Sequence, residues 1–350
     1  MASSIDRQAV QSCLERLASH SGEELLSKPP HWGDAIMCDG LLYAARALRI
    51  EAPVRRAIKW FEPKLAAGPD LERWFWFWSA EALPALGLYQ ATGKSDYLEY
   101  ARAIVDTVEH KTPHTADGVP IPHPPEPIVW IDVVYFVAPA MALLGRLTRD
   151  EAMVGRALDQ VLLHAKYLLD PVTDLFWHVA NAEKRTHSPC LWARGNSWFS
   201  IACSQVLREI KTAGLEGRFG GKAEDAALDL ARQMNAISAL QDQASGLWHT
   251  VLEQPTSYLE SSASAGFALG VGRALQLDLD RLNSFRARRT YERAISAICT
   301  KINSAGEFTG VSQQTPPGDF AHYQSIEVGT APFGSGVCMM ALAEALEQAP

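Results

Sequence analysis

One carboxylate in the sequence has a position suited to acid–base chemistry. Asp132 follows Trp130 in the stretch VWIDVVYFVAPAMALLG, residues 129–145. Apolar residues three and four positions apart predict a buried helix here, with Asp132 in its first turn. A carboxylate at that place meets free backbone N–H groups and the favourable end of the helix dipole. Asp132 is therefore either an ordinary helix cap or a general acid–base.

Aromatic and polar side chains stand before other apolar runs in the same way. The sequence has ten tryptophans, which predict either the flat walls of a sugar site or ordinary core packing. Arg194, in WARGNSW, offers a cation that either binds a ligand carboxylate or pairs with a neighbouring acid. The candidates for ligand contact from these patterns are Trp78, Trp130, His178, Trp192, Trp198, His249 and Tyr258.

The elements that must position these residues are helices of two kinds. The sequence has six apolar runs. Two of them cover residues 34–48 and 75–90, and the other four begin near Asp132, Gly195, Glu260 and Thr330. Amphipathic segments lie between them at residues 94–109, 149–169, 223–240 and 282–302. Because a helix that is apolar all round should be buried, the alternation predicts two concentric rings. The expected fold is all-α, an (α/α)6 barrel.

Short stretches with Gly or Asp beside an aromatic residue or His precede the apolar helices. They read DGVPIPH, TDLFWH, SGLWH and AGEFTG, and they predict short β excursions in the loops. These connections would gather His178, Trp192, His249 and Tyr258 at one end of the barrel, where loops on a rigid scaffold carry function. Since no linker or low-complexity segment is visible, residues 1–350 are expected to form a single domain.

Composition excludes several classes of partner. The 350 residues carry a formal net charge of −8 without a basic run, so nucleic acid is not an expected partner. No signal-peptide pattern and no uninterrupted apolar run of about 18 residues is present, which predicts a cytoplasmic protein without a membrane partner. The six cysteines form no CxxC pair and are expected to be reduced. No metal motif is visible, and the oligomeric state stays open.

The chain resembles the unsaturated glycuronyl hydrolases, above all the unsaturated rhamnogalacturonyl hydrolases of glycoside hydrolase family 105, which are related to family 88. The matching pieces, in family order, are VWIDVVYFVAP, LFWH, WARGNSW, GLWHTVLEQPTSYLESSASAGFALG and VGTAPFGSG. The resemblance implies an (α/α)6 barrel without a cofactor. It also implies an oligosaccharide substrate with a terminal 4,5-unsaturated uronic acid, whose vinyl ether double bond is hydrated by acid catalysis.

The resemblance also assigns roles. It implies that Asp132 is the general acid–base and that Arg194 binds the uronate carboxylate. Trp192 and Trp198 would be walls for the sugar. Hydrogen bonds to the substrate are expected from His178 and His249, for which a structural hydrogen bond is the alternative, and His123 stands where family members often carry a histidine. For Glu260, a role as a helix cap fits the sequence at least as well as a catalytic role.

The sequence departs from the family at the second inner helix. The family's Asn-x-Asp is replaced by RWFWFWSAE, without a carboxylate at residues 77–79, and Glu81 follows about one helical turn later. Whether Glu81 substitutes is open. The alternative is a barrel repurposed as a lyase, isomerase or cyclase that protonates an alkene in a less polar molecule, with Trp74, Trp76 and Trp78 around it. A third hypothesis is a sugar-binding barrel without catalysis.

Three structural arrangements would separate these hypotheses. A second carboxylate beside Asp132, with Arg194 facing the same cavity, would favour the hydrolase. A closed apolar cavity with Arg194 paired inside the protein would favour the alkene-protonating enzyme. A surface groove with Asp132 occupied in capping contacts would favour the binding protein.

Overall fold

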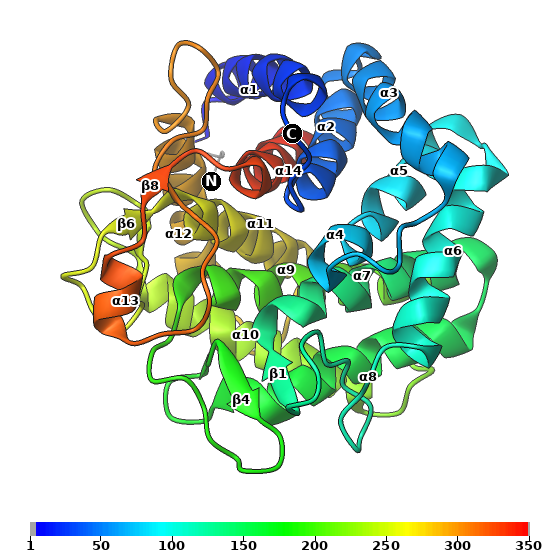
Figure 1. Cartoon of the computed structure of the whole chain (residues 1–350). Coiled ribbons are helices and arrows are strands. Elements are labelled where there is room, and N and C mark those ends of the chain that lie inside the picture. Colours follow the sequence, from blue (N-terminus) through cyan, green and yellow to red (C-terminus); the bar gives the residue numbers. More distant parts are fainter. Residues whose placement is uncertain (1–4, 349–350) are drawn as a thin grey trace.

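The inner ring of the protein is a closed circle of helices (Figure 1). The computed structural model describes residues 5–348. Within that range six helices pack each against the next around the ring, and the last packs against the first. They are α2 (Asp34–Leu48), α5 (Ala82–Thr92), α7 (Ile131–Thr148), α9 (Ala193–Ala213), α11 (Ser261–Leu277) and α14 (Pro332–Gln348). The predicted (α/α)6 barrel is confirmed.

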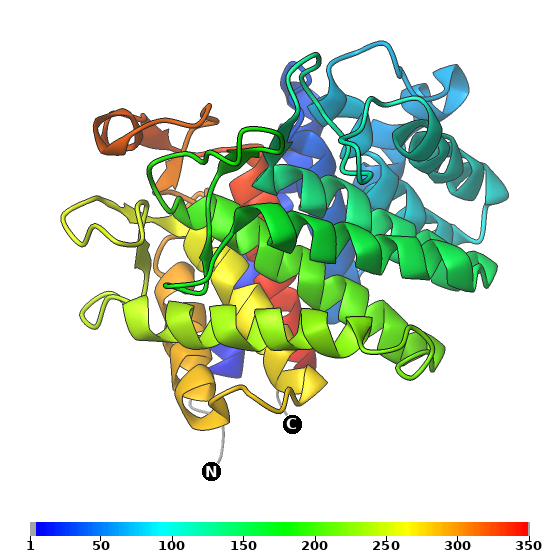
Figure 2. The ribbon, with the colours of Figure 1, turned by 90° about the horizontal axis from the view of Figure 1, so that it is seen from below.

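An outer layer of amphipathic helices covers this ring. In the described chain it consists of α1 (Arg7–Ser27), α3 (Ala52–Ala67), α6 (Ser95–His110), α8 (Glu151–Leu168), α10 (Lys222–Leu240) and α12 (Ser284–Cys299). The two kinds of helix differ in burial as their sequences predict. Every residue from Ser261 to Ala274 of α11 is buried, whereas α12 buries one stripe that includes Ala287, Tyr291 and Ala294. Figure 2 shows the green and yellow helices side by side, with the orange-red loop projecting at one end.

The second inner helix differs from the prediction. The expected continuous helix over residues 75–90 is split into α4 (Phe75–Ser79) and α5. Pro84 explains the break, because its nitrogen carries no hydrogen for the carbonyl of Ala80 and its ring would clash with that carbonyl. In the first turn of α5 the missing N–H costs nothing, so the helix restarts there.

Short antiparallel strand pairs lead into the inner helices, which confirms the predicted β excursions. In the part of the chain that is described they are β1 (Ile128–Trp130) with β4 (Val179–Asn181), β2 (Leu169–Asp170) with β3 (Leu175–Phe176), β5 (Trp248–His249) with β6 (Leu259–Glu260), and β7 (Val311–Ser312) with β8 (Val328–Gly329). A short helix, α13 (Phe320–Gln324), lies between β7 and β8. Strands β1 and β6 run directly into α7 and α11, so the strand pairing sets where these helices begin.

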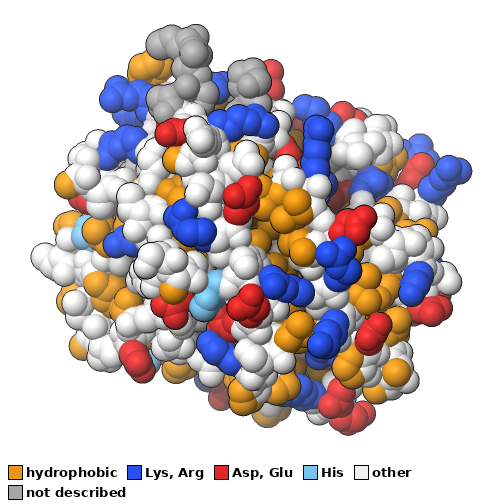
Figure 3. Space-filling model, turned by 90° about the horizontal axis from the view of Figure 1, so that it is seen from above, with side chains coloured by type: hydrophobic (Ala, Val, Ile, Leu, Met, Phe, Trp, Pro, Cys, Tyr) orange, Lys and Arg blue, Asp and Glu red, His pale blue; other side chains and the backbone are white. Residues whose placement is uncertain are grey.

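Burial and surface charge follow the composition. Among the described helices, α7 has the length and hydropathy of a membrane span, and 78% of it is buried inside the barrel. All six cysteines have free thiols, and all but Cys299 are buried. On the face shown in Figure 3 basic and acidic side chains are interspersed, without a broad area of one sign.

Candidate active site

A cavity of about 370 Å³ lies at the N-terminal ends of the inner helices. Most of its wall is aromatic, and the side chains that line it are Trp32, Trp74, Trp76, His123, Trp130, Asp132, Phe136, Trp192, Arg194, Gln314, Thr315 and Pro316. Among these described residues Asp132 is the single carboxylate. The cavity therefore combines one possible proton donor with flat apolar surfaces of the kind on which sugar rings stack.

The Asp132 carboxylate borders the cavity and does not cap its helix. It lies in the first turn of α7, and its side chain is 15% exposed. Its Oδ2 atom is buried and has no hydrogen-bond partner among the described residues, so this oxygen caps no backbone N–H group. The nearest basic atom is Nε2 of His178, at 3.4 Å. Asp132 is thus available to a ligand on the cavity side.

His178 is fixed from its other ring nitrogen by Tyr323. The Nδ1 atom of His178 lies 2.7 Å from the Tyr323 hydroxyl oxygen. That oxygen also accepts a hydrogen bond from the backbone N–H of Gly318, at 3.4 Å. Burial raises the pKa of Tyr323, so the hydroxyl keeps its proton, and we take it as the donor to Nδ1. The remaining ring proton of a neutral His178 then lies on Nε2 and faces Asp132.

Packing fixes the plane of the His178 ring. Trp192 stacks on His178 with ring centroids 4.2 Å apart, and Trp130 meets the same ring edge-on at 5.5 Å. The backbone carbonyl of His178 accepts from the N–H of Ile131 at 3.0 Å, at the point where β1 becomes α7. The residue that faces Asp132 is therefore tied to the start of the helix that carries Asp132.

Arg194 lines the cavity, and both of its terminal nitrogens donate to protein groups. One terminal nitrogen, Nη1, donates to the carbonyl of Ser312 at 2.8 Å and to the Ser312 hydroxyl at 2.6 Å. The other, Nη2, donates to the carbonyl of Gln313 at 2.8 Å. The guanidinium group lies between the rings of Trp192 and Phe333. Arg194 thus anchors the loop that begins at β7 and supplies Gln314, Thr315 and Pro316 to the cavity wall.

Glu260 is a structural acid. It is fully buried, and its carboxylate accepts from the backbone N–H groups of Ala263 at 2.6 Å and Ser312 at 2.9 Å. The first contact caps α11, and the second ties β7 to the same helix end. The Glu260 Oε1 atom lies 3.6 Å from Nη1 of Arg194. Burial lowers the pKa of Arg194, and the charge of Glu260 opposes that effect.

Glu81 does not supply a second carboxylate to the cavity. Its Oε1 atom accepts from the Lys64 ammonium group at 2.5 Å, and its other oxygen accepts from the Tyr100 hydroxyl. Lys64 and Tyr100 belong to the outer helices α3 and α6, so the carboxylate faces away from Asp132. This answers the question that the sequence left open.

Two of the predicted sugar-wall tryptophans lie elsewhere. Trp78 is buried, and its indole N–H donates to the carbonyl of Arg73 at 3.0 Å. Residues two apart on a helix differ by about 200° in direction, so Trp76 faces the cavity and Trp78 the core. Trp198 lies one turn deeper on α9 than Arg194 and packs on Tyr135 with centroids 4.7 Å apart. The predictions of cavity contact for Trp78 and Trp198 are therefore corrected.

Of the predicted histidines and Tyr258, some line the cavity and others lie outside its wall. His123 lines the cavity, and its Nε2 atom accepts from the Trp76 indole N–H at 3.3 Å. Burial lowers the pKa of His123, which favours the neutral ring that this contact requires. His249 and Tyr258 lie on the hairpin of β5 and β6, outside the cavity wall, and Nδ1 of His249 contacts the carbonyl of Ser257. Neither residue lines the cavity beside Asp132, and their contact with substrate stays a prediction.

Several wall residues were not foreseen from the sequence. Trp32 stands before α2, and its indole N–H donates to the side-chain oxygen of Gln314 at 2.5 Å. Phe136 lies one turn beyond Asp132 on α7. Tyr323, on α13, was not foreseen either, and it contacts His178 from outside the cavity wall. The HWGD entrance at residues 31–34 was a usable signal for Trp32. Residues 313–324 carry no repeat that marks them. Within residues 5–348 no group of three His, Cys, Asp or Glu side chains is arranged to hold a metal ion.

The chain is similar to a known unsaturated rhamnogalacturonyl hydrolase and to a solved structure from glycoside hydrolase family 105. An unsaturated rhamnogalacturonyl hydrolase of Bacillus subtilis (strain 168) is 30% identical over 241 residues, which are 66% of this chain and 64% of the relative. The match thus spans less than two thirds of that relative. A possible member of glycoside hydrolase family 105 from Klebsiella pneumoniae subsp. pneumoniae superposes with a TM-score of 0.87 at 25% identity, over 99% of this chain and 95% of that chain.

A more distant structure shares the fold. The unsaturated glucuronyl hydrolase of a Bacillus species has a TM-score of 0.73 at 16% identity, with 96% of each chain covered. The sequence model of Glycosyl Hydrolase Family 88 matches residues 5–349, nearly the whole length. With the barrel and its tryptophan-walled Asp132 in view, this match settles the family: the chain belongs to Glycosyl Hydrolase Family 88.

Proposed function

We propose that the protein is a hydrolase that removes a terminal 4,5-unsaturated uronic acid from an oligosaccharide by hydrating its double bond. The observation that carries this proposal is the Asp132 carboxylate, whose Oδ2 atom has no hydrogen-bond partner in the described chain and which borders a tryptophan-walled cavity. Membership of Glycosyl Hydrolase Family 88 supports the substrate class.

In the proposed reaction Asp132 acts first as an acid. Its carboxylic acid gives a proton to C4, and the positive charge that develops at C5 is shared with the ring oxygen. Water then adds to C5 and gives its proton to the Asp132 carboxylate, so the acid is restored. The resulting hemiketal opens to a keto-uronate and releases the rest of the sugar. Nε2 of His178 lies 3.4 Å from the Oδ2 atom of Asp132, and we assign the proton to the other carboxylate oxygen.

The hydrogens of Arg194 that bond Ser312 and Gln313 are not available to the uronate carboxylate. Another side chain therefore has to recognise it. We assign this task to Gln314, on the loop that Arg194 anchors. The side-chain oxygen of Gln314 accepts from Trp32, which leaves the amide NH₂ group as a donor toward the cavity. The buried guanidinium contributes its positive charge to the wall, close enough to favour an anion.

A second candidate function has a specific observation in its favour. The wall holds one carboxylate, many aromatic rings and an arginine whose donors bind protein groups. These features suit a lyase, isomerase or cyclase in which Asp132 protonates an alkene of a less polar molecule. Aromatic faces stabilise a cationic intermediate in such a reaction.

One assay tests the first function. The purified protein would be incubated with unsaturated disaccharides from rhamnogalacturonan, glucuronan and glycosaminoglycans, and the ultraviolet absorbance of the C4=C5 bond followed. We expect the absorbance to fall with the wild type and with Asp159→Asn, a matched change at a surface ion pair. Asp132→Asn should lose at least about a hundredfold in rate. Unchanged absorbance with all three substrates and a folded protein would refute the hydrolase and favour the second candidate.

A further inference from the structure

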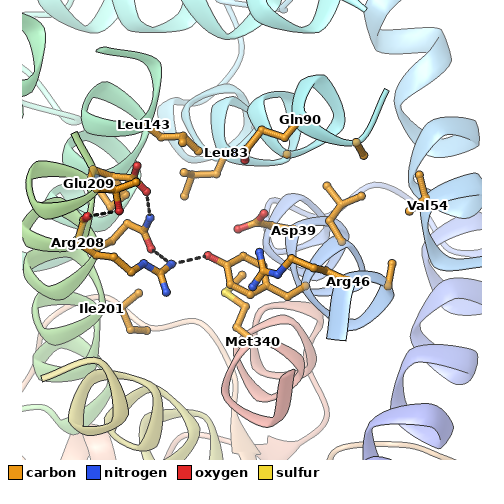
Figure 4. A pocket seen from close by; sticks show the side chains of 18 of the residues that line it. Asp39, Arg46, Val54, Leu83, Gln90, Leu143, Ile201, Arg208, Glu209 and Met340 are labelled. Carbon is orange, nitrogen blue, oxygen red and sulfur yellow. Dashed lines mark hydrogen bonds between the residues drawn. The ribbon is translucent and has the colours of Figure 1, made fainter. Parts of the chain in front are cut away.

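A second cavity, of about 560 Å³, lies at the opposite end of the barrel (Figure 4). Asp132 stands in the first turn of α7, whereas this cavity reaches Arg146 in the last turn of the same helix. In the described chain all six inner helices contribute to its lining, with Asp39, Leu83, Tyr135, Ile201, Arg273 and Met340 as one residue from each. Its volume falls within the roughly 300–1,000 Å³ of small-molecule sites.

Asp39 is the feature that points to a ligand. Its side chain is 7% exposed, and Figure 4 shows its carboxylate directed into the space between Leu83 and Ile201. Within residues 5–348 this carboxylate has no hydrogen-bond partner, although buried carboxylates are normally paired. Burial raises the pKa of Asp39 to about 7, against the opposing charges of Arg273, Arg46 and Arg208. A ligand with hydrogen-bond donors would satisfy this group.

The charges around the cavity indicate that such a ligand is uncharged. Of the described residues, five arginines line the cavity: Arg46, Arg49, Arg146, Arg208 and Arg273. Four of them are already held in ion pairs with protein carboxylates: Arg46 with Glu347, Arg146 with Glu209, and both Arg208 and Arg273 with Glu344. A charged ligand would compete with these ion pairs in a partly buried place, whereas a neutral hydrogen-bonding ligand would not.

The remaining lining alternates polar and apolar groups, as a sugar requires. The Tyr43 hydroxyl oxygen accepts from Nη2 of Arg208 at 3.2 Å and from Nη2 of Arg273 at 3.3 Å, so its proton is free for a ligand oxygen. Leu42 and Leu83 offer apolar surface for the C–H faces of a ring. We propose that this cavity binds an uncharged sugar, with Asp39 accepting hydrogen bonds from its hydroxyl groups.

This sugar site is separate from the cavity at Asp132. The two linings share no described residue, although they meet at neighbouring positions of α7, where Tyr135 faces the second cavity and Phe136 the first. Trp198 packs on Tyr135 and belongs to the layer between them. A sugar bound beside Asp39 therefore leaves room for substrate beside Asp132, and the two binding events can be measured independently.

Isothermal titration calorimetry of the full chain tests the proposal. The neutral probes are D-glucose, D-galactose, D-mannose and L-rhamnose, and the charged counterparts with the glucose ring are D-glucuronate and D-glucosamine. We expect at least one neutral sugar to bind more tightly than both charged rings. Asp39→Asn should weaken that binding about tenfold or more, because a hydrogen bond to a charged group is lost. Leu83→Trp should abolish it by filling the cavity, and Trp76→Ala, in the other cavity, should leave it unchanged.

The outcomes that would overturn the proposal are distinct. Binding that disappears in Trp76→Ala, or that persists in both Asp39→Asn and Leu83→Trp, would place the sugar elsewhere. Tighter binding of D-glucuronate or D-glucosamine would refute the neutral class. No heat from any of the four neutral sugars at about 50 mM, far above a weak dissociation constant of about 1 mM, would refute the site. Circular dichroism would verify folding, and Leu83→Trp keeps the test valid if Asp39→Asn does not fold.

Discussion

The Nε2 atom of His178 lies 3.4 Å from the Oδ2 atom of Asp132, while Nδ1 of the same ring lies 2.7 Å from the Tyr323 hydroxyl. Three segments far apart in the chain thus meet behind the carboxylate. With the Tyr323 hydroxyl as donor to Nδ1, the hydrogen of the His178 ring lies on Nε2. The Asp132 carboxylate then faces an N–H group instead of a bare ring nitrogen. Tyr323 is therefore a positioning residue in the proposed reaction.

Replacing Tyr323 by Phe should lower kcat about tenfold and leave KM nearly unchanged. The variant removes the donor to Nδ1, so His178 no longer holds its proton on Nε2 in every molecule. The measurement is steady-state kinetics across pH, in which the profile of the variant should differ in shape from that of the wild type. Tyr291→Phe is the control, because that buried hydroxyl has no hydrogen-bond partner in the described chain. Identical profiles for all three proteins would contradict the assignment.

Replacing Arg194 by Met should destabilise the fold by about 3–5 kcal/mol, because Glu260 would remain as a buried charge without its partner. The loop after β7 should also become sensitive to protease, since it loses the bonds to Ser312 and Gln313. Chemical denaturation and limited proteolysis measure the two effects. Arg55→Met, at an exposed ion pair with Glu51, should cost less than about 1 kcal/mol. Equal losses in the two variants would disprove the anchoring role.

Trp76 and Trp78 allow a matched comparison within one short helix. Trp76→Phe should raise KM about three- to tenfold, because a smaller ring offers the sugar less surface in the cavity wall. Trp78→Phe should lower the melting temperature without a change in KM, since Trp78 packs in the core and bonds Arg73. Kinetics and thermal melting of both variants provide the test. A larger KM effect from Trp78→Phe would reverse the assignment of the two faces.

Asp39 should make stability depend on pH in an unusual direction. Burial raises its pKa in the folded state to about 7, from the ordinary value of 3.8 that applies to the unfolded chain. The folded state therefore binds the proton more tightly, and the contribution of this group to stability is present below pH 4 and is lost as the pH rises to 7. Asp39→Asn should remove that slope and melt at a higher temperature than the wild type at pH 8. Asp159→Asn is the surface control, and a wild-type slope in Asp39→Asn would refute the effect.

Much of this protein can be predicted from local sequence. The apolar runs that start near Asp132, Gly195 and Glu260 are inner helices, and the charged segments between them are outer helices. This succeeds because helical period and the sign of each face are properties of neighbouring residues. The break at residues 80 and 81 was missed because a single proline, Pro84, overrode the apolar pattern.

The sequence by itself determined the alternation of apolar and amphipathic helices, the place of Asp132 at the start of one of them, and the resemblance of its motifs to a hydrolase family. Only the tertiary structure decided which side chains meet. Arg194 finds its acceptors more than a hundred residues away, at Ser312 and Gln313, and Tyr323 reaches His178 across a similar separation. Such contacts depend on how whole helices and loops are placed in space, which no local pattern records, and the same placement brings Asp39 into a cavity that all six inner helices build.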